Sequence, residues 1–484
     1  MRLLPFAAAM VVASAVAADD AAPPSPGMPS EPAAPIGPPP ADAPVVAPSP
    51  PSLAAAPKVE RQTLESLLDS SSWARQAIGA MRLERYRCEE SRTRLLAMLT
   101  SPSWPLRCFV IRVLALRGEA LPEGFLDREE NPRVVRTALR CRYEMNHDRL
   151  RRGIGTLRRS NDLADRMLSI ELAAASSDPA LADQAKEDLQ TLVFRMGRIE
   201  GGVLSPRLAA VAGAPDLRRH YEWQEWLRKN RATLSLRPVH LVPERPPATP
   251  ATGIAQLPPD AFAGLAEYMD QLGGRTIDLA IALDCTASMW GELAEAQGGI
   301  DDLMVFAGGI TRGIRVGLVA YRDRRDKDFE TKAWNFTESI EQARQRLWSL
   351  SADGGGDRPE AVQPALRLAY ANLGWNRDHQ RVLVLIGDAP PHVGYGAACV
   401  AMAKAGAEAG ITTHVIQARL GRDRAGERTV DIEHFPEIAA AGNGRCVSMA
   451  EGNALIVEIA GLTIGERYQP ELEEFFQTYL DLCR

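Results

Sequence analysis

Two hydroxyls and a carboxylate stand at alternating positions near the middle of the chain, in the pattern Asp284-x-Thr286-x-Ser288. They follow directly on the apolar run 277–283, and a second carboxylate, Asp388, closes a later apolar run. Carboxylate and hydroxyl oxygens are hard ligands of the kind that small divalent cations prefer. The pattern therefore predicts a divalent-cation site rather than a catalytic centre.

Apolar runs alternate with helix-like stretches between residues 275 and 466, which predicts a parallel sheet covered on both faces. The more polar segment 327–337 predicts an antiparallel edge strand. In an open α/β sheet, ligands bind beyond the carboxyl ends of the strands, where the strand order reverses. Asp284, Asp323 and Asp388 each follow a predicted strand, so we expect them to share one rim of the sheet, although Asp323 reads as a surface charge rather than a ligand.

The Asp284-x-Thr286-x-Ser288 pattern resembles the first motif of the metal-ion-dependent adhesion site of von Willebrand factor type A domains. The order of elements from 275 to 466 is similar to that family's as well. The resemblance implies that the Thr286 and Ser288 hydroxyls bind the cation directly and that Asp284 accepts hydrogen bonds from metal-bound water. It also implies that Asp388 supplies the carboxylate of the third loop.

The second loop of the predicted site departs from the family's pattern. Gly355-Gly356-Asp357 stands where the family usually has Gly-Gly-Thr, and an extra carboxylate should strengthen cation binding while weakening capture of an acidic ligand residue. Mg²⁺ is the expected cation because its octahedral shell suits a few carboxylates, hydroxyls and waters, and Mn²⁺ can replace it. Two alternatives stay open: Asp357 ahead of Pro359 could cap a helix, and Asp388 could shape a turn.

The first residues resemble an export signal, since Arg2 precedes an apolar stretch that ends in the small-x-small sequence Ala15-Val16-Ala17. No later segment reaches about 18 apolar residues, so no transmembrane segment is expected beyond the signal region. The chain should be periplasmic, on the cell surface or extracellular, whether the signal is cleaved or serves as an anchor. The predicted order is a signal peptide (1–17), a Pro/Ala-rich disordered tether (18–57), a helical domain (58–235), a Pro-rich linker (236–260), a type A domain (261–469) and a C-terminal helix (470–484).

The region between the two Pro-rich stretches reads as consecutive short helices. Arg75, Arg107, Arg136 and Arg166 are spaced by 32, 29 and 30 residues, and each opens an amphipathic stretch. A period near 30 with paired helices resembles HEAT-type repeats, and a helical bundle without repeats is the alternative. The predicted fold class is thus an all-α region, solenoid or bundle, followed by a doubly wound, Rossmann-like type A domain.

Composition and motifs favour a binding protein over an enzyme. A net charge of -6 without a basic stripe gives no sign of a nucleic-acid partner. Ser288 and His392 could be drawn into a hydrolytic triad, but Ser288 lacks the Gly-x-Ser-x-Gly elbow. We expect an exported, non-enzymatic protein whose type A domain binds an unidentified protein ligand. The alternatives are a scaffold whose helical repeats bind the partner while the metal only orders loops, and a hydrolase.

Seven cysteines in an exported chain leave at least one thiol free or paired between chains. Most read as small buried hydrophobic residues. A pair between Cys399 and Cys446 inside the type A domain is one possibility that the sequence leaves open.

Overall fold

The fold is taken from a computed structural model that describes most of the chain from Ser52 to Cys483. The described residues are 52–483 except 161–162, 197, 216, 218, 245–258, 325, 356–358, 419–420, 423–428, 449–454 and 465–468. The predicted signal peptide and nearly all of the predicted tether lie outside them, as does most of the predicted linker. Ser49–Arg484 form one compact unit.

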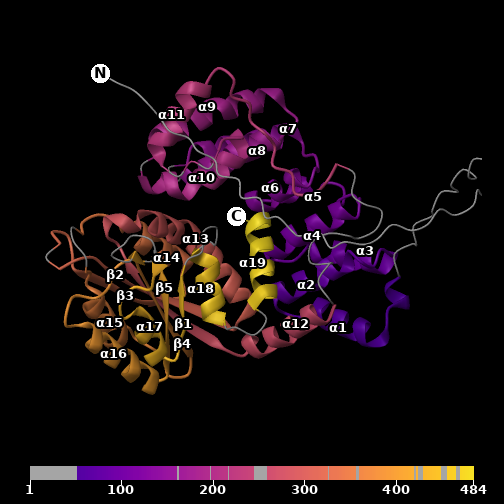
Figure 1. Ribbon diagram of the computed structural model, residues 1–484. Helices are drawn as coiled ribbons and strands as arrows, with labels where there is room; N and C mark the ends of the chain where they lie inside the picture. The colour runs from indigo at the N-terminus through magenta and orange to yellow at the C-terminus, as the bar shows by residue number, and fades with distance from the viewer. Residues whose placement is uncertain are drawn as a thin grey trace, which may run out of the picture. The chain divides into compact units, whose positions relative to one another are not determined.

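The first part of this unit is helical, as the sequence predicts (Figure 1). Arg107 and Arg166 play matching roles in it, because each donates to the carbonyl six residues earlier in the chain. A HEAT-type repeat itself stays a prediction. The helices are α1 (Lys58–Leu68), α2 (Trp73–Leu83), α3 (Glu89–Met98), α4 (Trp104–Leu116), α5 (Phe125–Arg128), α6 (Pro132–Arg140), α7 (His147–Arg158), α8 (Leu163–Ala175), α9 (Pro179–Arg195), α10 (Arg198–Ala212) and α11 (His220–Asn230).

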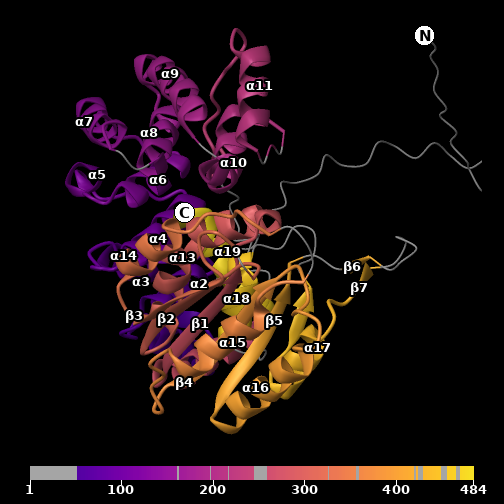
Figure 2. The same ribbon diagram turned by 90° about the vertical axis from the view of Figure 1, so that its left-hand side faces the viewer.

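The second part alternates strands and helices around a six-stranded sheet of order β3-β2-β1-β4-β5-β8. All neighbours pair in parallel except β2 and β3, so the predicted antiparallel edge strand is confirmed. The chain order reverses at the pair β1 and β4, next to each other in the middle of the sheet (Figure 2). The strands are β1 (Thr276–Asp284), β2 (Gly313–Tyr321), β3 (Thr331–Thr337), β4 (Gln380–Gly387), β5 (Ile411–Gln417) and β8 (Cys446–Ser448), and a separate hairpin joins β6 (Gly421–Arg422) to β7 (Thr429–Val430).

Helices cover both faces of the sheet, because its central strands carry apolar side chains on both sides. In β1, Ile277, Ile281 and Leu283 face one core, whereas Ala280 and Ala282 face the other. The covering helices are α13 (Trp290–Ile310), α14 (Ile340–Trp348) and α18 (Leu455–Ile464) on the first face, and α15 (Val362–Ala371), α16 (Gly396–Glu408) and α17 (Phe435–Ala441) on the second. The doubly wound architecture predicted from the alternating runs is confirmed.

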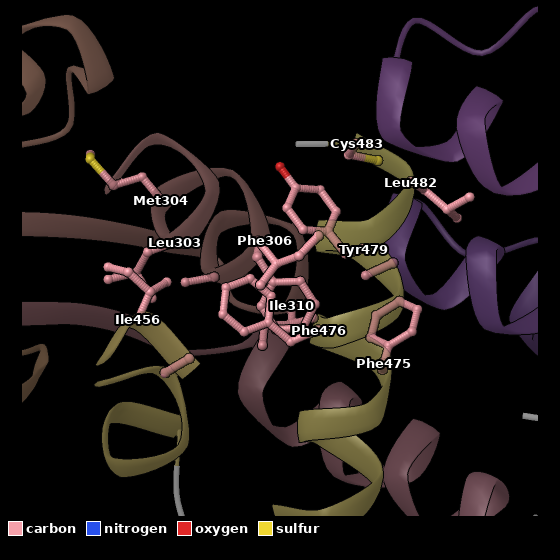
Figure 3. Close-up of a cluster of buried hydrophobic side chains, with 14 of the residues drawn as sticks. Leu303, Met304, Phe306, Ile310, Ile456, Phe475, Phe476, Tyr479, Leu482 and Cys483 are labelled. Atoms are coloured by element: carbon pink, nitrogen blue, oxygen red, sulfur yellow. The ribbon is translucent and has the colours of Figure 1, made fainter. Parts of the chain in front are cut away.

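Two further helices complete this part, α12 (Pro259–Gly273) and α19 (Gln469–Cys483). Helix α19 contacts α13 and α18 of the α/β part and α4 and α6 of the helical part. Its ring-bearing residues Phe475, Phe476 and Tyr479 gather with Phe306 of α13 in one buried cluster (Figure 3). The core of α1 to α6 is therefore continuous with one face of the sheet, while α7 to α11 enclose a core of their own around Trp223. The boundaries 58–235, 261–469 and 470–484 stay a prediction.

Helices α12 and α18 were not predicted from the sequence, whereas α13 to α17 and α19 fall where the apolar patterns place them. Trp223 is fully buried, as expected of a core anchor. Within the described part of the chain, no helix combines the length and the apolar character that crossing a membrane requires.

A histidine in the sheet makes folding stability depend on pH. His414 of β5 accepts a hydrogen bond from the backbone of Arg445 (Nδ1 to N, 3.1 Å), and burial, aided by the Arg445 charge, lowers its pKa to about 4. Because the folded pKa lies below the ordinary value of 6.5, unfolding takes up a proton in acid. The stabilisation that comes from keeping His414 neutral is fully present above pH 6.5 and is lost as the pH drops toward 4. The free energy of unfolding falls by up to about 3 kcal/mol over this range.

Urea unfolding at pH 4.5 and 7 checks this dependence. The free energy of unfolding should differ less between the two pH values in His414→Gln than in the wild-type chain. In His147→Gln, which alters an exposed histidine side chain, the difference should persist. An unchanged difference in His414→Gln would show that other groups cause the acid sensitivity.

Candidate metal centre

The first motif lies at the carboxyl end of β1, directly beside the point where the strand order reverses. Asp284 is the last residue of β1, and its Oδ1 accepts hydrogen bonds from Thr286 N (2.8 Å) and Thr286 Oγ1 (2.7 Å). Thr286 Oγ1 lies 3.3 Å from Ser288 Oγ. Residues Ala287–Met289 form a single 3₁₀ turn that leads into α13. The local fold thus gathers the carboxylate and both hydroxyls that the sequence singled out.

The second carboxylate oxygen of Asp284, Oδ2, determines the electrostatics of the candidate cation site at the carboxyl end of β1. Asp284 is fully buried, and no donor among the described residues makes a hydrogen bond of normal geometry to its Oδ2. Burial raises the pKa of the carboxyl to about 7, and the neighbouring charge of Asp388 adds to the shift. A buried carboxylate oxygen with no donor is costly, and a cation with its bound waters would satisfy it.

The third loop brings Asp388 against the first motif. β1 and β4 pair directly, with Leu283 opposite Ile386, so Asp388 follows β4 beside the end of β1. Asp388 is itself buried. Gly387 permits the close approach, because a Cβ at that position would collide with the Tyr321 hydroxyl, which donates to Ile386 O (3.0 Å).

The second loop is tied to both of the others by backbone hydrogen bonds. Asp353 N donates to Cys285 O (3.1 Å), Ala287 N donates to Gly354 O (3.3 Å), and Glu360 N donates to Pro390 O (2.9 Å). Gly355 has a positive φ of 67°, and a Cβ there would lie 3.1 Å from Thr286 Cβ. Asp357 lies outside the described residues, but the described residues on both sides of it contact the first and third loops.

A buried arginine anchors the second loop, a role that was not predicted from the sequence. Arg322 follows β2 and is almost fully buried under the ring of Phe329, with 4.4 Å from the guanidinium carbon to the ring centroid. It donates to Ser351 O (2.8 Å) and pairs with Asp326 (3.2 Å). Its position directly after an apolar strand, in a stretch of alternating charges, was the available signal.

Asp323, which we did not expect to be a ligand, pairs with a residue of the third loop. His392 Nε2 lies 3.0 Å from Asp323 Oδ1. Cys285 is fully buried, as expected for a residue on the core side of the loop, and burial raises the pKa of its thiol above the usual range. Asp323 and His392 therefore link the loop after β2 to the loop after β4 beside the predicted cation site.

The donor set decides whether this corner fits a cation. Among the residues that the structure describes, no three His, Cys, Asp or Glu side chains gather in a metal-binding group. The described residues offer the Thr286 and Ser288 hydroxyls beside the Asp284 and Asp388 carboxylates, and Asp357 as a third carboxylate stays a prediction. Few protein oxygens, with waters in the remaining positions, are what Mg²⁺ accepts.

Neither the protein-family models nor the curated proteins contain a match. Among solved structures, the chain is similar to the conserved hypothetical protein BatB from Bacteroides thetaiotaomicron (22% identity over 39% of this chain and 96% of that one, TM-score 0.30). It is also similar to an aerotolerance-related membrane protein from Bacteroides fragilis (23% identity over 40% of this chain and 98% of that one, TM-score 0.29).

A third similar structure is proximal thread matrix protein 1 from the mussel byssus with a zinc-occupied metal-ion-dependent adhesion motif (12% identity over 40% of this chain and 46% of that one, TM-score 0.31). The strand order and the helices on both faces define the class of this part of the chain as a doubly wound α/β fold with one antiparallel edge strand. The von Willebrand factor type A assignment rests on the first motif and stays a prediction.

Proposed function

We propose that the chain is an exported, non-enzymatic binding protein whose α/β part holds Mg²⁺ or Mn²⁺ and uses the occupied rim to bind a protein ligand. In this proposal Thr286, Ser288, Asp357 and Asp388 hold the cation, and Asp284 holds its waters. The observation that carries the proposal is the buried Asp284 Oδ2, which finds no donor of normal geometry within the described part of the chain and lies beside Asp388 where the strand order reverses.

The loop after Asp388 supports a protein ligand over a small molecule. Val393 is 92% exposed and Tyr395 is 38% exposed, the former among the most exposed large apolar side chains described. The Arg324 guanidinium lies over the Tyr395 ring, 4.2 Å from its centroid. Exposed aromatic, apolar and arginine side chains beside a charged centre are typical of protein-binding surfaces.

Cation-dependent capture tests this proposal. The immobilised full chain should retain a protein from a cell-envelope extract in Mg²⁺ and release it with EDTA. Val393→Asp should lose the capture, whereas Val59→Asp, at another exposed valine (76% exposed, on α1), should keep it. Capture that ignores EDTA and Val393→Asp would contradict the proposal.

One observation favours the scaffold alternative enough to keep it in the same experiment. A surface cavity of about 570 Å³ lies among α2, α3 and the start of α4, next to Trp73 and Arg94. If the helical part binds the partner there, capture should survive EDTA and fail in Arg94→Glu. That outcome would replace the rim as the binding surface.

A further inference from the structure

Two cysteines from opposite ends of the compact unit meet in its core. Cys108 lies on α4 in the helical part, and Cys483 lies in the last turn of α19. Both side chains are fully buried, and the two thiols are close enough for each to shift the pKa of the other. Figure 3 shows Cys483 on α19 close to the helices of the helical part.

The surrounding contacts hold the two helices in register at this point. Thr137 of α6 donates its hydroxyl to Leu482 O (2.7 Å), and the same hydroxyl lies 3.4 Å from Cys108 Sγ. Arg140 donates to Asp481 O (2.8 Å). The last turn of α19 is therefore fixed by its backbone carbonyls, and the Thr137 hydroxyl joins the residue next to Cys483 to Cys108.

Ring contacts extend the same interface along both helices. Phe475 of α19 lies 5.4 Å, centroid to centroid, from Phe109, the residue next to Cys108. One turn further, Tyr479 lies 6.3 Å from Trp104 at the start of α4. Helices α4 and α19 are therefore in contact over several turns, and their proximity does not depend on one flexible side chain.

We propose that Cys108 and Cys483 form a disulfide that joins the helical part to α19 when the chain folds in an oxidising compartment. All seven cysteines are free in the structure, so the bond requires an oxidant, which we name as a small-molecule or protein disulfide. One thiolate attacks that disulfide and expels a thiolate, and the second cysteine then attacks the mixed disulfide. Two thiols lose two electrons and two protons, and the oxidant disulfide becomes two thiols.

The protonation of the pair suits this chemistry. Burial alone would raise the pKa of Cys108, but its hydrogen bonds, first that from Cys483, outweigh burial and lower the pKa. Cys141, the nearest alternative partner on the same side of the core, has its pKa raised to about 12 by burial. Since the thiolate is the reactive form, Cys108 is the attacking group, and Cys141 is the matched control.

To test this proposal, the full chain is folded in a buffer of reduced and oxidised glutathione, and its free thiols are blocked with iodoacetamide. Its peptides are then mapped by mass spectrometry without reduction. We expect a peptide of Cys108 linked to Cys483 and a thermal midpoint roughly 5–10 °C above that of the reduced protein. Cys483→Ala should lose the linked peptide and the redox-dependent midpoint, and Cys141→Ala should keep both. Alkylation of every cysteine in the wild-type chain, or a link between Cys108 and Cys141, would overturn the proposal.

Discussion

Asp284→Asn should weaken Mg²⁺ binding by about 10- to 100-fold, the usual effect of losing a residue that orients metal-bound ligands. The variant keeps the shape of the buried side chain and the acceptor that Thr286 uses, but it removes the charge beside Asp388. A cation at 100 times its dissociation constant stabilises the folded state by about 2.7 kcal/mol. Thermal unfolding with and without Mg²⁺ should therefore show a shift in the wild-type chain and little or none in Asp284→Asn.

Asp378→Asn provides the control for this prediction. Asp378 is exposed and precedes β4, whereas Asp388 follows the other end of the same strand. Its variant should keep the full Mg²⁺-dependent shift. Equal shifts in the wild-type chain and Asp284→Asn would show that the cation does not use this corner.

The largest loss of stability should come from Asp278→Ala, at the opposite end of β1. Asp278 is fully buried and accepts hydrogen bonds from Arg315 Nε (2.7 Å) and Nη2 (2.6 Å). It also accepts one from Asn376 N (2.8 Å), and His379 Nδ1 lies 2.7 Å from its carboxylate. Removing one partner of a buried ion pair leaves a charge without compensation and costs about 3–5 kcal/mol. Urea unfolding at pH 7 measures the loss.

The pH dependence of folding stability shows whether the charge of Asp278, and not only its packing, stabilises the fold. Burial alone would raise the pKa of Asp278, but its hydrogen bonds, first that from Arg315, outweigh burial and lower it. Its contribution is therefore present above the ordinary pKa near 4 and is lost as the pH falls through the lower folded value. Asp278→Asn should flatten this acid limb, and Asp127→Ala, at an exposed aspartate, should leave it intact. An Asp278→Ala chain as stable as the wild type would refute the prediction.

The sequence predicted the sheet and the first motif because both are local. β1 and β4 are near-continuous apolar runs, and the motif lies within five residues of a strand end. Helix α18 was not predicted because Leu455–Ile464 is apolar on nearly every side, so its sequence lacks the alternation of apolar and polar residues that indicates a helix. The C-terminal helix was predicted, but its contacts with α4 and α6 depend on long-range packing that no local pattern records.

The three-loop arrangement was predicted only in part. The positions of Asp284 and Asp388 follow from two neighbouring strands, but the anchoring of the second loop by Arg322 depends on Ser351 and Asp326, which lie apart in the sequence. The contact of Cys108 with Cys483 depends in the same way on the packing of α4 against α19. Spacing in one sequence cannot reveal such contacts, because they exist only after the helices have packed.

Titration of Mn²⁺ into the full chain, followed by calorimetry, tests the central claim most directly. The account predicts binding of one cation per chain, competition by Mg²⁺, and a strong loss of affinity in both Asp284→Asn and Asp357→Ala, with Asp378→Asn unchanged. The absence of binding heat at several temperatures in the wild-type chain, or equal affinity in all four proteins, would contradict it.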